Sequence, residues 1–225
     1  MRVVKTNDGT FTIYRPDIDE HYHSVFGAIT ESLHIFIQSG FNSFPLKDEI
    51  TVFEIGFGTG LNALLTCFSA LQQNKKVHYY TIEKYPLSDT IINQLNYTGF
   101  LTTEPEAGEI FARIHNSPWE QPVNILPGFS LKKINADLNR YHPDFNYDLI
   151  YFDAFSPEKQ PELWSRDVFN GLFGNLNENG MLLTYSVKGE VKRMMKDVGF
   201  IVQKLPGPPG KREILRGLKK ICIEK

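Results

Sequence analysis

Hydrophobic residues along the chain follow two alternating patterns, one typical of strands and one typical of helices. Short apolar runs of the kind found in buried strands occupy residues 51–55, 77–83, 123–126, 147–153 and 181–186. Segments with helical spacing separate these runs. The alternation predicts an α/β fold whose mostly parallel sheet is covered by helices on both faces. Ligands of such sheets bind at the carboxyl ends of the strands.

The helical pattern is clearest directly after residue 60 and again before Gly199. The first of these helices has a one-sided apolar stripe, and residues 187–198 carry one apolar face that ends at Gly199. A further helical pattern covers residues 24–39, and we expect a helical insertion beside the ligand site within 99–121. The stripe after residue 60 consists of Leu61, Leu64, Leu65, Phe68 and Leu71.

Both ends of the chain add antiparallel strands to this plan. Residues 3–5 and 10–14 flank Asn7-Asp8-Gly9, a sequence typical of a hairpin turn. Near the other end, residues 213–216 and 220–223 predict an antiparallel edge. We therefore expect one domain spanning residues 1–225, with residues 1–45 as an appendage and residues 50–225 as the core.

Composition fits an ordinary soluble enzyme domain: 225 residues, of which 41% are hydrophobic and 22% are charged. No run of apolar residues approaches the length of a membrane span, and the first residues do not resemble a signal peptide, so we expect a cytoplasmic protein. Cys67 and Cys222 are far apart and flanked by apolar residues. They support neither a disulfide framework nor a metal site, and we expect buried, inert thiols and no metal.

Charge is distributed unevenly along the chain. The net charge of −2 argues against a general nucleic-acid binder. From Lys188 to Lys225, however, eight Lys and three Arg outnumber four acidic residues, so this end carries +7 and the rest of the chain −9. A basic end provides a local surface for phosphate groups. A solvated helix face with a charged edge strand would produce the same pattern.

The first apolar strand runs into a Glu-x-Gly-x-Gly-x-Gly turn, formed by Glu54, Gly56, Gly58 and Gly60, and a helix pattern follows. Glycines let the backbone approach a ligand, and the free amides of the first helical turn face the same spot. The spacing departs from the dinucleotide fingerprint. Glu54 would repel a diphosphate but suits a cation, which favours S-adenosyl-L-methionine (SAM) over NAD. The alternative is a glycine-rich turn that binds nothing.

Three carboxylates are expected at the same edge of the sheet: Glu54, Glu83 and Asp153. Glu83 ends the second strand at about the distance from the glycine turn at which an acidic residue accepts the ribose hydroxyls. Asp153 begins the loop Asp153-Ala154-Phe155-Ser156-Pro157, where an acid and an aromatic residue can hold a neutral amine. Glu83 as a helix cap and Asp153 as a turn residue remain the alternatives.

Together these residues resemble a known family, the methyltransferase domain of MnmC-type tRNA modification enzymes. The segment 54–62, Glu-Ile-Gly-Phe-Gly-Thr-Gly-Leu-Asn, is similar to the family's glycine motif, and 83–87 to its Glu-Lys-Phe-Pro-Leu segment. Residues 151–157, with Lys159, Pro161 and Trp164, resemble its Asp-Gly-Phe-Ala-Pro loop. Residues 184–186 and 210–213 also find counterparts, as do Tyr22, Ser24 and Glu31.

The resemblance implies a Rossmann-like class I SAM-dependent methyltransferase fold. It also implies transfer of a methyl group from SAM to 5-aminomethyl-(2-thio)uridine at the wobble position of tRNA. In this interpretation Asp153 and Phe155 position the target amine. Cofactor contacts are expected from Glu54, Gly56, Phe57, Gly58, Thr59, Gly60, Asn62, Glu83, Lys84, Gly128 and Phe129. The candidates for tRNA phosphate contact are Lys188, Lys192, Arg193, Lys211 and Arg212.

Two departures from the family pattern shape these expectations. The bifunctional relatives carry a flavin-dependent oxidase that 225 residues cannot accommodate, so we expect a separate enzyme to install the free aminomethyl group. Where the family has Gly-Asp after the third strand, this chain has Gly128-Phe129. We therefore expect Phe129 to stack on adenine or a backbone carbonyl to read it.

Two other functions remain open at this point. One is a SAM-dependent N-methyl or aminopropyl transferase for a small amine or polyamine, which the same glycine turn and Asp153 loop would serve. A basic groove beside the pocket would favour tRNA over this alternative. The other is a noncatalytic SAM- or nucleoside-binding subunit, against which the Asp153 loop argues.

Overall fold

In the computed structural model, residues 1–104 and 106–220 are described, and their strands form two sheets. The larger sheet has eight strands in the order β10–β11–β9–β8–β4–β5–β7–β6. Its five central strands are parallel, while β6 and β11 run antiparallel to their neighbours. The expected α/β class, with a mostly parallel sheet and an antiparallel C-terminal edge, is confirmed. The strands are β4 (Glu49–Ile55), β5 (Lys76–Ile82), β6 (Pro122–Leu126), β7 (Phe129–Ile134), β8 (Tyr147–Phe152), β9 (Leu176–Thr184), β10 (Ile201–Pro206) and β11 (Glu213–Leu218).

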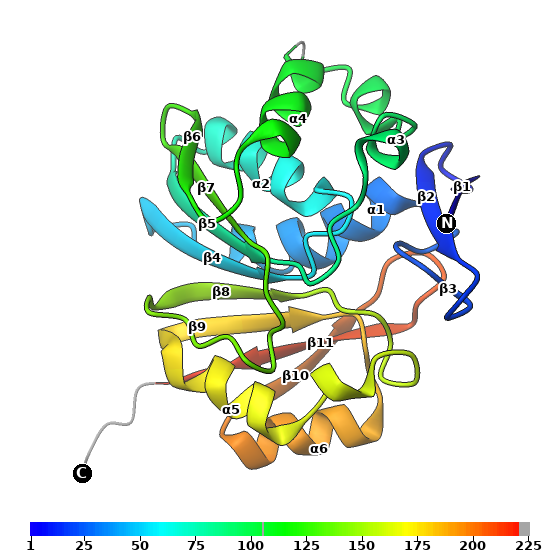
Figure 1. Ribbon diagram of the computed structural model, residues 1–225. Coiled ribbons are helices and arrows are strands. Elements are labelled where there is room, and N and C mark those ends of the chain that lie inside the picture. The colour runs from blue at the N-terminus through cyan, green and yellow to red at the C-terminus, as the bar shows by residue number, and fades with distance from the viewer. Residues whose placement is uncertain (105, 221–225) are drawn as a thin grey trace.

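Helices cover both faces of the large sheet and create two cores (Figure 1). α1, α2, α4 and the π-helix η1 pack on one face, and α5 and α6 pack on the other. All six residues of β8 are buried, as expected for a central strand with apolar neighbours on both sides. The helices are α1 (Ala28–Ser32), η1 (Leu33–Gln38), α2 (Leu61–Gln72), α3 (Asp89–Ile92), α4 (Ala107–Asn116), α5 (Arg166–Asn175) and α6 (Gly189–Val198), with short 3-10 turns at Phe41–Ser43, Tyr97–Phe100 and Pro161–Leu163.

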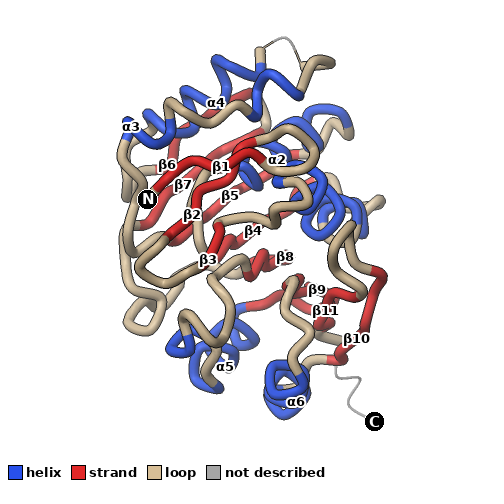
Figure 2. The backbone as a smooth tube through the Cα atoms, turned by 90° about the vertical axis from the view of Figure 1, so that its right-hand side faces the viewer, coloured by secondary structure: helices blue, strands red, loops and turns tan. Residues whose placement is uncertain are grey.

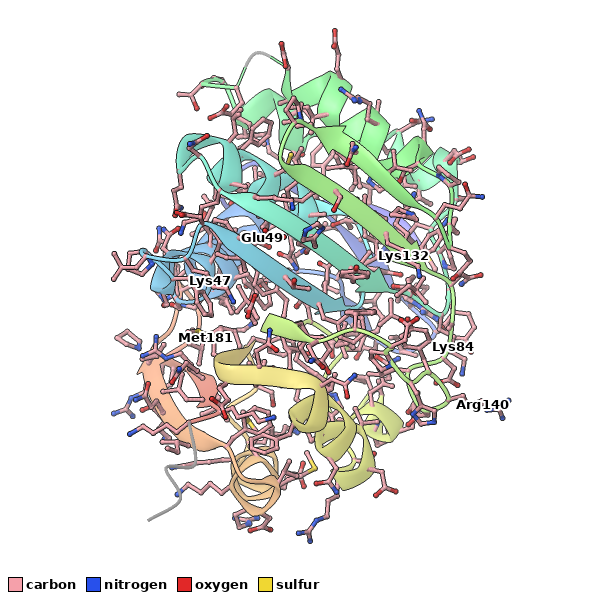
Figure 3. All side chains as sticks on the ribbon, turned by 90° about the vertical axis from the view of Figure 1, so that its left-hand side faces the viewer. Lys47, Glu49, Lys84, Lys132, Arg140 and Met181 are labelled. Atoms are coloured by element: carbon pink, nitrogen blue, oxygen red, sulfur yellow. The ribbon has the colours of Figure 1, made fainter. Side chains whose placement is uncertain are left out.

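The smaller sheet consists of β1 (Arg2–Lys5), β2 (Phe11–Arg15) and β3 (Glu20–His21), all antiparallel. The predicted hairpin around Asn7-Asp8-Gly9 is therefore confirmed. Figure 1 shows this sheet at the right, next to the carboxyl ends of the central strands, and Figure 2 views the molecule from that side. Figure 3 views the opposite side, where Lys47 and Glu49 mark the beginning of β4. The small sheet therefore covers the edge at which a ligand is expected.

The prediction of five core strands missed β7. Residues 123–126 form the outer edge strand β6, and the next residues turn back as β7, which is the parallel neighbour of β5. Charged Lys132 and Lys133 interrupt the apolar pattern of this strand. Lys133 is nevertheless buried, because its ammonium donates to the backbone oxygen of His115 (2.6 Å) and lies over the rings of Trp119 and Phe57.

Several boundaries differ from those that the pattern predicts. The helix expected over 24–39 begins only at Ala28 and continues as a π-helix. α2 is buried on nearly all sides over residues 61–70, whereas Leu71, expected in its apolar stripe, is exposed. β11 confirms the strand expected at 213–216, but its outer partner is β10. Residues 221–223, the rest of the other expected strand, lie outside the described residues.

Cys67 is buried in α2, as expected, and burial raises the pKa of its thiol to about 12. Cys222 lies outside the described residues. Among the helices of the described residues, none combines the length and the apolar character that crossing a membrane requires.

Candidate active site

A pocket of about 400 Å³ lies at the carboxyl ends of β4, β5, β7 and β8, against the small N-terminal sheet. The chain segments that follow these four strands form its floor and walls, and residues from β2 to α1 close one side. The position agrees with the rule that ligands bind at the carboxyl ends of parallel strands. Most of the residues expected at the site meet here, although they come from distant parts of the chain.

The glycine turn between β4 and α2 forms part of the pocket wall. Gly56 and Gly58 have positive φ angles of 90° and 49°. A Cβ at Gly56 would lie 2.9 Å from the Asp153 carbonyl oxygen, and one at Gly58 would lie 3.1 Å from the Tyr22 ring. Glycine is the residue that fits such a backbone, so at Gly56 and Gly58 the bare backbone faces the pocket. Phe57, Thr59 and Asn62 line the pocket beside it, and Gly60 begins α2 as its N-cap.

Glu83 follows β5 and is fixed by two backbone amides. Its carboxylate accepts hydrogen bonds from the amide of Gly58 (3.2 Å) and from the amide of Tyr85 (2.8 Å). Its backbone oxygen accepts from the Asn135 side chain (2.8 Å). The glycine turn and the acidic residue after the second strand are thus held together as one unit facing the pocket.

Gly128 and Phe129, expected near adenine, are not brought to the pocket. They lie at the beginning of β7, where Phe129 pairs with Val77, so they are at the end of the sheet away from the site. Phe129 is buried and stacks on Tyr79, with ring centroids 5.7 Å apart. The expectation failed because the strand after Gly128 was not recognised.

The residues after β7 occupy the place that was expected for Gly128 and Phe129. Ala136, Asp137 and Leu138 line the pocket beside Lys84. The ammonium of Lys84 lies 2.8 Å from a carboxylate oxygen of Asp137 and, with the turn amide of Asn139, lowers the pKa of that carboxyl to about 2. Asp137 was missed by sequence analysis. Recognising residues 129–134 as a strand would have identified it as the acidic residue at that strand's exit.

Asp153 follows β8 and lines the pocket with its carboxylate partly buried. The Asn62 amide donates to this carboxylate at 2.8 Å. Burial raises the pKa of Asp153 to about 7, and the nearby Glu31 carboxylate raises it further, while Asn62 and Lys211 oppose the rise. A carboxyl group with this pKa can accept a proton near neutral pH.

Glu54 is fully buried in β4 and does not line the pocket. Neither of its carboxylate oxygens has a hydrogen-bond partner among the described residues. Burial raises the pKa of Glu54 to about 8, so the carboxyl is largely protonated at neutral pH. The structure therefore places it beneath the site, close to Asn62, and not as a charged group facing a ligand.

Phe155 forms an aromatic wall of the pocket with Tyr22. Their ring centroids are 5.0 Å apart in an edge-to-face arrangement, and the Arg15 guanidinium lies over the Phe155 ring at 5.7 Å. The Trp164 indole donates to the Phe155 backbone oxygen at 2.8 Å, which fixes the loop. Arg15 at the end of β2 and Glu20 in β3 also line the pocket. No sequence signal identified them, because only the docked small sheet brings them there.

The five basic residues expected to contact tRNA have different surroundings. Lys188, Lys211 and Arg212 line a second cavity beside the pocket. Lys211 also lines the main pocket, where it pairs with Glu31 at 2.8 Å, and Lys188 pairs with Glu158. Because Lys211 faces inward, we define the basic rim without it, as Lys188, Lys192, Arg193 and Arg212. No group of three or more His, Cys, Asp or Glu residues within the described ranges could hold a metal ion.

Comparisons with known proteins agree with this architecture. Residues 109–220 match the model of a family described as S-adenosyl-L-methionine-dependent methyltransferase. The chain is 31% identical over 218 residues to the tRNA 5-methylaminomethyl-2-thiouridine biosynthesis bifunctional protein MnmC of Idiomarina loihiensis, with 88% of this chain and 35% of the relative covered. It is 30% identical to the protein of the same name from Cupriavidus metallidurans, covering 94% and 33%. The chain thus spans about a third of the length of these relatives.

A solved structure shares the fold. The crystal structure of MNMC2 from Aquifex aeolicus superposes with a TM-score of 0.80 at 23% identity, covering 96% of this chain and 69% of that one. The Rossmann-like methyltransferase fold expected from the resemblance is therefore confirmed. The chain belongs to the S-adenosyl-L-methionine-dependent methyltransferases and is similar over most of its length to the MnmC proteins.

Proposed function

We propose that this methyltransferase binds SAM in the pocket and methylates the primary amine of 5-aminomethyl-(2-thio)uridine at the wobble position of tRNA. The observation that carries the proposal is the meeting of the glycine turn, Glu83 and Asp153 around one pocket. The name of the relatives, which specifies tRNA 5-methylaminomethyl-2-thiouridine biosynthesis, supports this substrate.

The residues present suit a methionine-linked nucleoside. The side-chain-free backbone at Gly56 and Gly58 leaves room for close approach, and the Glu83 carboxylate faces the same space and can accept ribose hydroxyls. Ala136 and Asp137 are the proposed adenine contacts, in place of Gly128 and Phe129. When bound, SAM supplies an electrophilic methyl group on a positively charged sulfur.

Asp153 is proposed as the group that deprotonates the amine. An aminomethyl group is mostly protonated in neutral solution, and an ammonium has no lone pair with which to attack. Asp153 takes one proton from it, becoming a neutral carboxylic acid, and the amine keeps its lone pair. Phe155 and Tyr22 form the wall against which the uracil ring lies, and they keep water from the amine. The nitrogen then bonds to the methyl carbon, and the electrons of the broken carbon–sulfur bond remain on sulfur.

The basic rim is proposed to hold the phosphates around the target nucleotide. Two of its residues, Lys188 and Arg212, line the second cavity, which shares Tyr185 and Lys211 with the pocket. We place the reaction in the cytoplasm, after a step that supplies the free aminomethyl group.

Methylation assays with labelled SAM test this function. tRNA bearing 5-aminomethyluridine is offered beside unmodified tRNA and a panel of polyamines. We expect label only in the modified tRNA, recovered as 5-methylaminomethyluridine. Labelling of polyamines but not of tRNA would favour the small-amine alternative, and binding of SAM without any transfer would favour the noncatalytic one.

A further inference from the structure

The pocket already contains an ammonium group of the protein itself. The Lys211 ammonium lies 2.8 Å from one carboxylate oxygen of Glu31, and the other oxygen accepts a hydrogen bond from the backbone amide of Ser24 at 2.7 Å. Glu31 is 8% exposed, so its carboxylate is largely shielded from water, whereas the Lys211 side chain is 28% exposed. The two residues come from α1 and from the loop before β11, and both line the pocket with Asp153.

An aromatic ring completes the surroundings of this ammonium. The Lys211 nitrogen lies 5.1 Å from the centroid of the Tyr185 ring, and the Tyr185 hydroxyl is fixed by donating to the Ala154 backbone oxygen at 2.9 Å. A carboxylate on one side and an aromatic face on the other are what a primary ammonium ion needs in a partly dry site. The arrangement therefore has the chemistry of an alkylammonium site, with the Lys211 side chain in it.

The proposed reaction requires such a site for its substrate. The aminomethyl group of the target uridine carries the same kind of cation as the lysine side chain. Glu31 and Lys211 are both close enough to Asp153 to influence its pKa in opposite directions, so the Lys211 ammonium lies near the proposed proton acceptor. Exchanging one ammonium for another would keep Glu31 paired and would avoid the large cost of a buried, unpaired carboxylate.

We propose that Glu31 is the carboxylate that binds the aminomethyl cation of the substrate. In the absence of substrate the Lys211 ammonium pairs with Glu31, and it moves outward when a substrate phosphate attracts it. The inference rests on the proposed function and names the residue that recognises its substrate. Lys211 can make this move because it lines both cavities, and in the second cavity it lies with Lys188 and Arg212. A phosphate held by the basic rim would provide the lysine with a new partner there.

The test measures recognition of the amine separately from recognition of phosphates. Two anticodon stem-loop RNAs are used that are identical except that one carries 5-aminomethyluridine and the other uridine. Their Kd values are measured by fluorescence anisotropy on protein saturated with S-adenosylhomocysteine, so that no turnover occurs. The ratio of the two Kd values reports amine recognition, because phosphate contacts cancel.

Glu31→Gln should reduce this preference by about tenfold or more, since it removes a charge-assisted hydrogen bond. Lys211→Met, which keeps Glu31 but removes its occupant, should increase the preference. A structural role of the ion pair would make both variants change the ratio in the same direction, and that result would overturn the inference. So would an unchanged ratio in Glu31→Gln.

Glu49→Gln is the matched control. Glu49 also pairs with a lysine, Lys76, at 3.0 Å, but it lies at the start of β4, at the end of the strand away from the pocket (Figure 3). Its ratio should stay within about twofold of that of the unsubstituted protein, as expected for an exposed pair. Methylation by the unsubstituted protein is measured separately. Its absence would refute the proposed function, whereas methylation with a ratio insensitive to Glu31→Gln would refute this inference alone.

Discussion

Replacing Asp153 with Asn should stabilise the protein and at the same time slow methyl transfer strongly. The pKa of this carboxyl is raised from 3.8 to about 7 in the folded protein, mainly by burial. A raised pKa means that folding opposes ionisation. The stability that the neutral carboxyl retains at low pH is therefore lost as the pH rises from about 3.8 to about 7, and it remains lost above that range.

The size of this loss follows from the pKa change. At about 1.4 kcal/mol per pKa unit, the rise corresponds to at most about 4 kcal/mol of folding free energy above neutral pH. Asn has nearly the same shape and carries no charge, so the variant lacks the penalty. Its side chain can still bond to the Asn62 amide through its oxygen. The same change removes the proton acceptor, which should reduce turnover by about 10²–10⁴-fold.

Urea unfolding of both proteins at about pH 5 and about pH 8 measures the first effect, because the advantage of the variant should grow as the pH rises toward about 7, while the unfolded state is ionised and the folded state still binds the proton. Glu54 also has a raised pKa, and the Asp153 charge contributes to the rise, so removing that charge lowers the pKa of Glu54 and adds to the advantage of the variant. Single-turnover methylation measures the second effect, with SAM affinity determined by calorimetry as the control. A stability difference that is independent of pH would refute the burial argument. A parental rate would refute the catalytic role.

Three further predictions concern the cofactor site and the substrate surface. Gly58→Val should abolish SAM binding in calorimetry, because φ at this residue is 49° and a Cβ would already lie 3.1 Å from the Tyr22 ring; unchanged affinity would mean that the cofactor binds elsewhere. Phe129→Ala should lower the free energy of unfolding by about 3–5 kcal/mol through loss of core packing, yet leave the SAM affinity of the folded protein unchanged, and a selective loss of affinity would restore Phe129 to the adenine site. Charge reversal of the basic rim should raise the KM for tRNA and leave SAM binding unchanged. It should also flatten the salt dependence of tRNA binding, by about 0.9 in the log–log slope for each phosphate contact to a duplex that is lost. An unaltered salt slope would place the RNA on another surface.

The sequence determined the parts of the site that depend on neighbours in the chain. An apolar run ending in Glu-x-Gly-x-Gly-x-Gly specifies a strand, a sharp turn and a helix, because local backbone preferences alone require them. Glu83 and Asp153 each follow an apolar strand of the same sheet. Since parallel strands end at the same edge, their convergence could be predicted without coordinates, and the pocket contains both.

Tertiary structure decided whatever depends on partners far away in the chain. β7 was missed because a buried lysine breaks its apolar pattern, and Lys133 is tolerated there only because His115 and two aromatic rings receive its ammonium. That omission moved the expected adenine contact from the end of β7 to its beginning. From the sequence, Glu54 is expected to be a charged residue that contacts the cofactor, but its fully buried position favours the neutral acid. From the sequence, Lys211 is expected to be a cation on the surface. Docking of the N-terminal segment, however, places Glu31 next to it, although Glu31 lies 180 positions earlier in the chain. Burial and long-range pairing set the charge and direction of a polar side chain, and neither is encoded in its immediate neighbours.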